Sequence, residues 1–126
     1  MYVPSELGVD HTIHDFPHPE WDAKKCHFVI AQEVLPRSTK IIRISIDLFL
    51  EDSIGWWLGF DTKKGVYGAV GSAEKKASFT IVDDVGKVLA EMSVEELEQV
   101  LDQLHISRAS ASMSEVVKLM VDAKTC

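Results

Sequence analysis

The run 40–50 places apolar side chains at every second position, which is the period of a β-strand with one buried face. Ile42, Ile44 and Ile46 point to one side of such a strand, and Leu48 continues the series. This run therefore predicts one strand of a core sheet, and the rest of the chain has to supply the strands that pair with it.

Further apolar runs from residue 26 onward are short, rich in Ile, Val and Phe, and separated by turn residues. This pattern is typical of antiparallel strands. Two of the turns, 61–65 and 83–86, begin with Asp and end with Gly, as in a type I turn closed by a left-handed residue. The pattern predicts six strands, at about 26–35, 40–50, 55–60, 66–71, 76–82 and 87–92.

Beyond residue 92 the apolar spacing changes from that of a strand to that of a helix. Ser93 and Glu96 are spaced as a capping box, and so are Ser112 and Glu115. We therefore expect two helices joined by the Ser- and Ala-rich stretch 107–111. The expected fold is α+β: an antiparallel β-meander of about five or six strands, followed by a C-terminal two-helix hairpin packed on one sheet face. The last helix is expected to carry the apolar stripe Met113, Val116, Val117 and Met120.

Residues 1–25 are expected to form an irregular, acidic N-terminal arm, because Pro4, Pro17 and Pro19 interrupt any long helix. Residues 26–126 are then expected to form a single α+β domain, since 126 residues is the usual size of one domain. The arm is the most acidic part of the chain, because its first 22 positions include five Asp or Glu and no Lys or Arg.

The net charge of −7 argues against nucleic-acid binding, which depends on Lys and Arg. We expect no membrane segment, because no run approaches the roughly 20 apolar residues of a span. The first residues lack the features of a secretory signal, and two cysteines, Cys26 and Cys126, are too few for a disulfide framework. The expectation is a cytoplasmic protein with reduced thiols and no cofactor.

Both faces of the expected sheet carry apolar side chains, which is unusual for an antiparallel sheet with one face in water. If residues 51–54 form a tight turn, Phe49 and Trp56 lie opposite each other, on the same face as Phe60. Two short helices cover only one face, so the other needs the arm, a second subunit, a partner or a ligand. We therefore expect Phe49, Trp56 and Phe60 to contact a protein partner.

The sequence contains no convincing catalytic set. No Gly-x-Ser-x-Gly elbow, Walker loop or dinucleotide fingerprint occurs, and Cys26 and His27, as strand neighbours, would point to opposite faces. The leading hypothesis is a non-catalytic binding protein of the inhibitor, immunity or accessory type. It would self-associate or meet a protein partner through a sheet face and an acidic surface. The acidic residues expected on its first helix are Glu95, Glu96, Glu98 and Asp102.

Two alternatives stay open. A small-molecule pocket between sheet and helices would use Trp57, Tyr67 and Arg43 as ligand-binding residues. A metal-dependent enzyme would use the histidines of the arm, which alternate with Asp and Glu and supply the ligand types that Zn or non-haem iron needs. His11 and His14 would share a face only in a helix, which Thr12, Ile13 and the later prolines disfavour, so the cluster is more simply interpreted as a solvated loop rich in His and Asp. These histidines are His11, His14 and His18.

Overall fold

The computed structural model describes residues 1–13, 16–53, 55, 59–69 and 71–124. In these ranges the chain forms, in order, η1 (His11–Ile13), α1 (Pro19–Val34), β1 (Arg43–Ser45), β2 (Leu48–Phe49), α2 (Leu50–Ser53), β3 (Phe60–Asp61), β4 (Val66–Tyr67), β5 (Lys76–Thr80), α3 (Val82–Val94), β6 (Gln103–His105), β7 (Ala109–Ser112) and α4 (Met113–Lys124).

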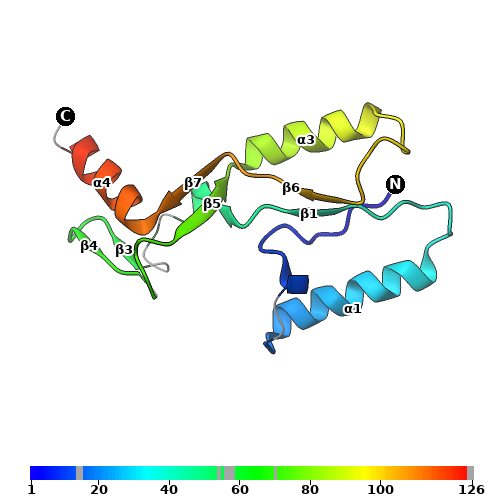
Figure 1. The fold of residues 1–126 in the computed structure, drawn as a ribbon, viewed down its shortest axis with the longest axis horizontal. Helices are drawn as coiled ribbons and strands as arrows, with labels where there is room; N and C mark the ends of the chain where they lie inside the picture. Colours follow the sequence, from blue (N-terminus) through cyan, green and yellow to red (C-terminus); the bar gives the residue numbers. More distant parts are fainter. Residues whose placement is uncertain (14–15, 54, 56–58, 70, 125–126) are drawn as a thin grey trace.

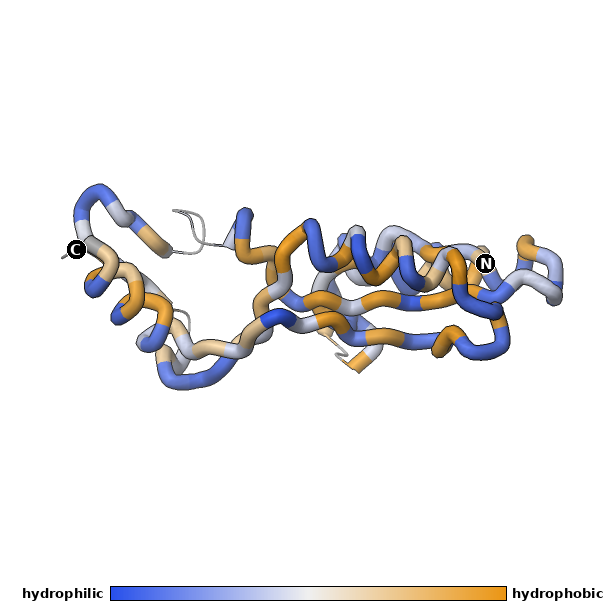
Figure 2. The backbone as a smooth tube through the Cα atoms, turned by 90° about the horizontal axis from the view of Figure 1, so that it is seen from above, coloured by the Kyte–Doolittle hydropathy of each residue, from blue (hydrophilic) through white to orange (hydrophobic). Residues whose placement is uncertain are grey.

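The molecule is elongated, and its elements gather in two groups (Figures 1 and 2). One group contains α1, α3, β1 and β6, and the other contains α4, β3, β4, β5 and β7. Each group surrounds its own set of buried apolar side chains. The first core contains Ile42, Ile44, Ile46, Val85, Met92 and Val100. The second contains Phe60, Phe79 and Val116.

The described strands form three small sheets. β1 pairs in parallel with β6, with Arg43 opposite Gln103. β5 is the central strand of a three-stranded sheet. It pairs in parallel with β2 on one side and antiparallel with β7 on the other. β3 and β4 form a hairpin. Asp47 lies between β1 and β2 with a left-handed φ of 56°, and the chain passes there from the first sheet to the second.

Helix α3 covers the apolar side of β1. Its apolar side chains recur at helical spacing, so that Val85, Val88, Leu89 and Met92 share the face that packs on the first core. The helix begins where the Val82 amide donates to the Glu51 carboxylate over 2.9 Å. The predicted turn at 83–86 and the predicted strand at 87–92 are therefore both wrong, because these residues continue one helix.

Helix α1 begins with Pro19 at its first position, where a missing amide hydrogen costs nothing, and has Glu20 and Asp22 in its first turn. It ends at Val34 because Leu35 precedes Pro36, which disfavours a helical conformation for Leu35. The predicted irregular arm is thus helical from Pro19, and the predicted strand at 26–35 is wrong. The helix crosses the expected boundary between residues 25 and 26.

The expected meander is wrong for a further reason: both strands of the 40–50 run, β1 and β2, pair in parallel with later strands. The expected two-helix hairpin is also wrong, because β6 and β7 lie between α3 and α4 in the chain. Ser93 is in the last turn of α3, where its hydroxyl donates to the Ala90 carbonyl over 2.7 Å. The capping box at 93–96 and the acidic helix that it would open are therefore wrong as well.

Two local predictions are confirmed, and so is the fold class. The Ser112 amide donates to Glu115 over 2.8 Å and the Glu115 amide donates back to the Ser112 hydroxyl over 3.2 Å, which is the predicted capping box of α4. In the turn at 61–65, the Lys64 amide donates to Asp61 and Gly65 has a left-handed φ of 68°. The α+β class is also correct.

Candidate functional site

The side of β1 opposite the isoleucines carries the cation Arg43, because successive residues on a strand point to opposite faces. Its Nε donates to Glu6 Oε2 over 3.0 Å, and its Nη2 donates to Asp10 Oδ1 over 3.2 Å. The side chains of Arg43 and Glu6 are only 14% and 3% exposed. These charges are withdrawn from water and bonded to each other, so they hold the N-terminal segment on the sheet.

Polar neighbours complete this network around Asp10. Burial raises the pKa of Asp10, but hydrogen bonds from Thr12 and Gln103 and the positive charge of Arg43 outweigh it, so that this pKa lies below its usual value of 3.8. The side-chain amide of Gln103, which is on β6, donates from Nε2 to Asp10 Oδ2 over 2.8 Å. The carboxylate is therefore ionised at neutral pH and joins the N-terminal segment to β1 and β6.

His11, next to this network, is 2% exposed. Burial lowers its pKa below the usual 6.5, against the opposing effect of the Glu6 charge, so the ring is neutral at pH 7. Its Nε2 atom is buried and has no hydrogen-bond partner among the residues that the structure describes. Such a histidine costs stability when it is protonated.

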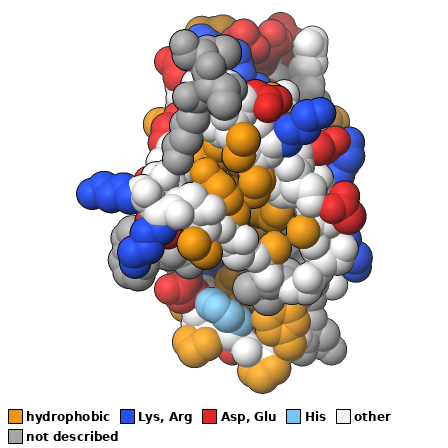
Figure 3. Space-filling model, turned by 90° about the vertical axis from the view of Figure 1, so that its left-hand side faces the viewer, with side chains coloured by type: hydrophobic (Ala, Val, Ile, Leu, Met, Phe, Trp, Pro, Cys, Tyr) orange, Lys and Arg blue, Asp and Glu red, His pale blue; other side chains and the backbone are white. Residues whose placement is uncertain are grey.

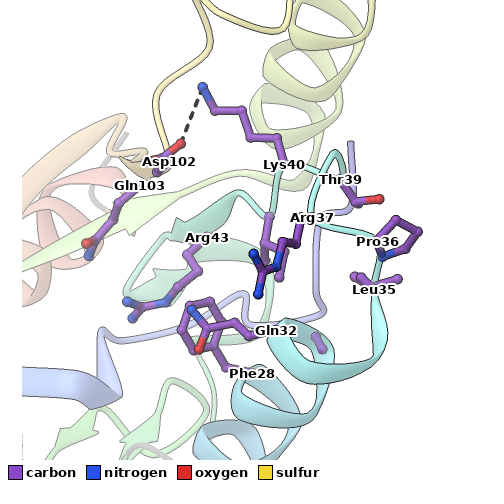
Figure 4. Close-up of a pocket in the computed structure, with 12 residues that line it drawn as sticks. Phe28, Gln32, Leu35, Pro36, Arg37, Thr39, Lys40, Arg43, Asp102 and Gln103 are labelled. Atoms are coloured by element: carbon purple, nitrogen blue, oxygen red, sulfur yellow. Dashed lines mark ion pairs between the residues drawn. The ribbon is translucent and has the colours of Figure 1, made fainter.

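A cleft of about 480 Å³ lies between the C-terminal half of α1 and the edge of the β1–β6 sheet (Figure 4). Phe28 and Gln32 of α1 form one side, and Arg43 lies over the Phe28 ring at 5.2 Å from its centroid. At the opposite end Lys40 pairs with Asp102 over 3.3 Å. The volume suits a small polar ligand, but Arg43 and Lys40 are both neutralised by carboxylates.

The outer face of α1 is mixed, because the exposed Asp22 and Glu33 lie on it among exposed apolar side chains. Val29, Ile30 and Val34 are 50%, 55% and 75% exposed, and Cys26 on the same side is exposed too. The inner face contributes Phe28 to the cleft and buries Ala31. Because charged residues interrupt it, the outer face is not a continuous apolar stripe.

At the other end of the molecule, apolar side chains gather around a second hollow, between the β3–β4 hairpin and α4 (Figure 3). Tyr67, Met113 and Val117 line it together with the small residues Gly68 and Ala73. Arg43 and Tyr67, which the sequence suggested for one pocket, thus line two different hollows. Trp57, the third residue suggested for that pocket, lies outside the described residues.

The residues expected to contact a partner are not exposed together. Phe60 is 3% exposed and belongs to the second core, while Phe49 is partly buried and packs against the first. Trp56 lies outside the described residues. Three of the exposed large apolar side chains, Val29, Ile30 and Val34, are instead on α1. Its sequence signal is Pro19 followed by two acids and then apolar residues at helical spacing.

The expected metal ligands are not brought together in the part that the structure describes. His11 is buried, His18 is the N-cap of α1 with its ring against Trp21, and His14 lies outside that part. Among the described residues, no group of three His, Cys, Asp or Glu side chains is arranged to hold a metal ion.

Of the helices in the described ranges, none combines the length and the apolar character that crossing a membrane requires. No protein family, curated protein or solved structure with which the chain was compared matches it.

Proposed function

We propose that this chain is a non-catalytic binding protein that works as an assembly of identical subunits. The observation that carries the proposal is the exposed area. A compact monomer of 14.1 kDa exposes about 6,700 Å², whereas this chain exposes 8692 Å². The excess is about 2,000 Å² per chain, which is within the range that obligate homodimers bury per subunit.

The chemistry of the exposed surface supports the same proposal. Exposed large apolar side chains are found on the helices α1, α3 and α4. An assembly would remove part of this surface from water, at a gain of about 25 cal/mol for each Å². The exposed carboxylates of Glu95, Glu96 and Glu98 would remain available to a basic protein partner. A cytoplasmic location is part of the proposal, in keeping with the free thiol of Cys26.

Native mass spectrometry of the untagged protein tests this function, together with sedimentation velocity over a range of concentrations. We expect a dimer or higher oligomer with no added mass. A monomer at all concentrations up to about 100 μM, well above the Kd of an obligate assembly, would overturn self-association. A monomer with a small added mass would instead favour the second candidate, a small-molecule-binding protein. The 480 Å³ cleft beside Arg43 is the observation that favours it.

A further inference from the structure

Three cationic side chains line the cleft between α1 and the β1–β6 sheet, and one of them is left without a counter-charge. Arg43 and Lys40 are each bonded to carboxylates. Arg37 lines the same cleft and is exposed, and no carboxylate within the described ranges pairs with it. In Figure 4 its guanidinium points toward the middle of the cleft. This group is therefore available to an anion.

The backbone holds Arg37 at this place. Helix α1 ends before Leu35, and residues 36–39 then form a turn in which the Thr39 amide donates to the Pro36 carbonyl over 2.7 Å. Arg37 is a central residue of this turn, directly after the proline, whose ring fixes its own φ. The turn orders the chain without engaging the side chain of Arg37, so the guanidinium keeps its donors for a ligand.

The charges around the cleft favour an anion with a single negative charge. The net charge of −7 repels anions, but at physiological salt, charges farther away than about 8 Å are largely screened. A bound anion therefore responds mainly to the lining of the cleft, where the charge of Arg37 is the uncompensated one. Asp102, at the end where it pairs with Lys40, would repel a second negative charge on the ligand.

Much of the remaining lining is apolar. Phe28 and Ala31 of α1 form one side, and Leu35 and Ile41 extend it. Arg43, at 5.2 Å from the centroid of the Phe28 ring, keeps that ring in place. A ligand with an apolar body would displace water from this wall, which is favourable, and a volume of about 480 Å³ has room for such a body.

We infer that this cleft binds a small monocarboxylate with an apolar body, and that Arg37 is the residue that recognises the carboxylate. A guanidinium donates two parallel hydrogen bonds to a carboxylate, an arrangement that lysine cannot reproduce. The apolar body of the ligand then lies along the side of the cleft that Phe28 and Ala31 form. This inference rests on the second candidate function, the small-molecule-binding protein, and names its ligand class. It does not depend on self-association.

The first experiment compares four probes that differ in one property each: phenylacetate, the uncharged phenylacetamide, acetate without the apolar body, and the doubly charged phenyl phosphate. Amide chemical shifts in two-dimensional NMR spectra follow each titration and show which residues respond. Phenylacetate is expected to bind with a Kd of about 1 mM or below and to shift the signals of Arg37 and Phe28. The other three probes are expected to bind at least about tenfold more weakly.

The second experiment changes the cleft. Arg37→Gln is expected to raise the Kd of phenylacetate about tenfold or more, and Arg37→Lys by less, because a charge remains without the paired hydrogen bonds. Lys118→Gln is the matched control, since it removes the same charge from an exposed position on α4, outside the cleft. Gln32→Trp fills the cleft from the exposed side of α1 without changing the charge and is also expected to weaken binding.

Each outcome decides for or against the inference. Weakening by Arg37→Gln and Gln32→Trp, with Lys118→Gln unchanged, supports it. Equal binding to Arg37→Gln and Lys118→Gln would overturn the role of Arg37, and tighter binding of phenyl phosphate or acetate would overturn the ligand class. If phenylacetate does not bind below about 10 mM, the inference fails, whereas a different bound mass in native mass spectrometry would still support the second candidate function. Sedimentation velocity on the same samples tests the proposed assembly separately.

Discussion

On one face of the β1–β6 sheet, helix α3 buries Val85 and Met92 against Ile42 and Ile44, whereas on the other face helix α1 meets the sheet through an arginine and a cleft. The apolar face depends on burial, which is strong and not directional. The polar face depends on a few bonds around Arg43, which are directional and hold only if every partner is present. The first face therefore supplies stability, and the second sets where the N-terminal segment lies.

The difference explains why the two helices have different surfaces. Helix α3 has enough apolar contact with its own subunit to be stable there, and its outer side is polar and charged. Helix α1 buries Ala31, lines the cleft with Phe28 and exposes Val29, Ile30 and Val34. The three predictions that follow test the contrast between the two faces through the free energy of unfolding.

The largest effect is expected on the polar face. Arg43→Met leaves the 3%-exposed Glu6 without its cation, and an unpaired buried charge costs about 3–5 kcal/mol of unfolding free energy. Urea unfolding measures the loss. The double variant Arg43→Met with Glu6→Gln is expected to recover much of it, because the buried charge is gone. Equal stability of the single and double variants would mean that the ion pair does not hold this face.

A smaller effect is expected on the apolar face. Met92→Ala on α3 removes an 8%-exposed side chain from the first core and is expected to cost about 2–3 kcal/mol. The matched change on α1, Val29→Ala, is expected to stay within about 0.5 kcal/mol, since Val29 is 50% exposed. Both values come from urea unfolding. A cost for Val29→Ala as large as that of Met92→Ala would remove the contrast between the two helices.

The smallest effect is a pH dependence of the free energy of unfolding, which arises from His11 beside the polar face. The folded state holds the pKa of His11 below 6.5, so the unfolded chain takes up a proton first as the pH falls. His11 therefore contributes its full stability above about pH 6.5, and this contribution declines as the pH falls toward the folded-state pKa. His11→Gln is expected to flatten that part of the profile. Identical profiles for the two proteins would exclude His11 as the titrating group.

Local signals in the sequence predicted local structure well. The capping box at Ser112 and Glu115 and the turn at 61–65 rest on side chains that bond within four residues, so they need nothing from the rest of the chain. The alternation from Ile42 to Ile46 correctly indicated a buried strand face. The identity of the partner strands was not predictable in this way, because a period of two marks a strand and says nothing about what lies beside it.

Two helices were missed for different reasons. The β-branched, aromatic run around Phe28 and Val29 favours a strand, and the proline and acids that start α1 outweigh it in the fold. In α3, the two Asp and Gly86 resemble a turn, although Val85, Val88, Leu89 and Met92 already have helical spacing. The strand β7 was taken for a connection because Ala and Ser rarely form strands, and its pairing with β5 imposes the conformation. None of these signals predicted the exposed side chains of α1, because which side chains are exposed there depends on the segment being a helix and not the expected strand.

The parallel pairing of β1 with β6 has a consequence for how the protein is made. Arg43 and its partner Gln103 are sixty positions apart, so a ribosome adding 5–20 residues per second finishes β1 roughly 3–12 s before β6 exists. For most of that time α3, which covers the isoleucines of the β1 region, is also incomplete. The nascent chain therefore presents Ile42, Ile44 and Ile46 to the cell as an open hydrophobic segment, the kind that chaperones bind, and burial of the first core has to wait until most of the chain has left the ribosome.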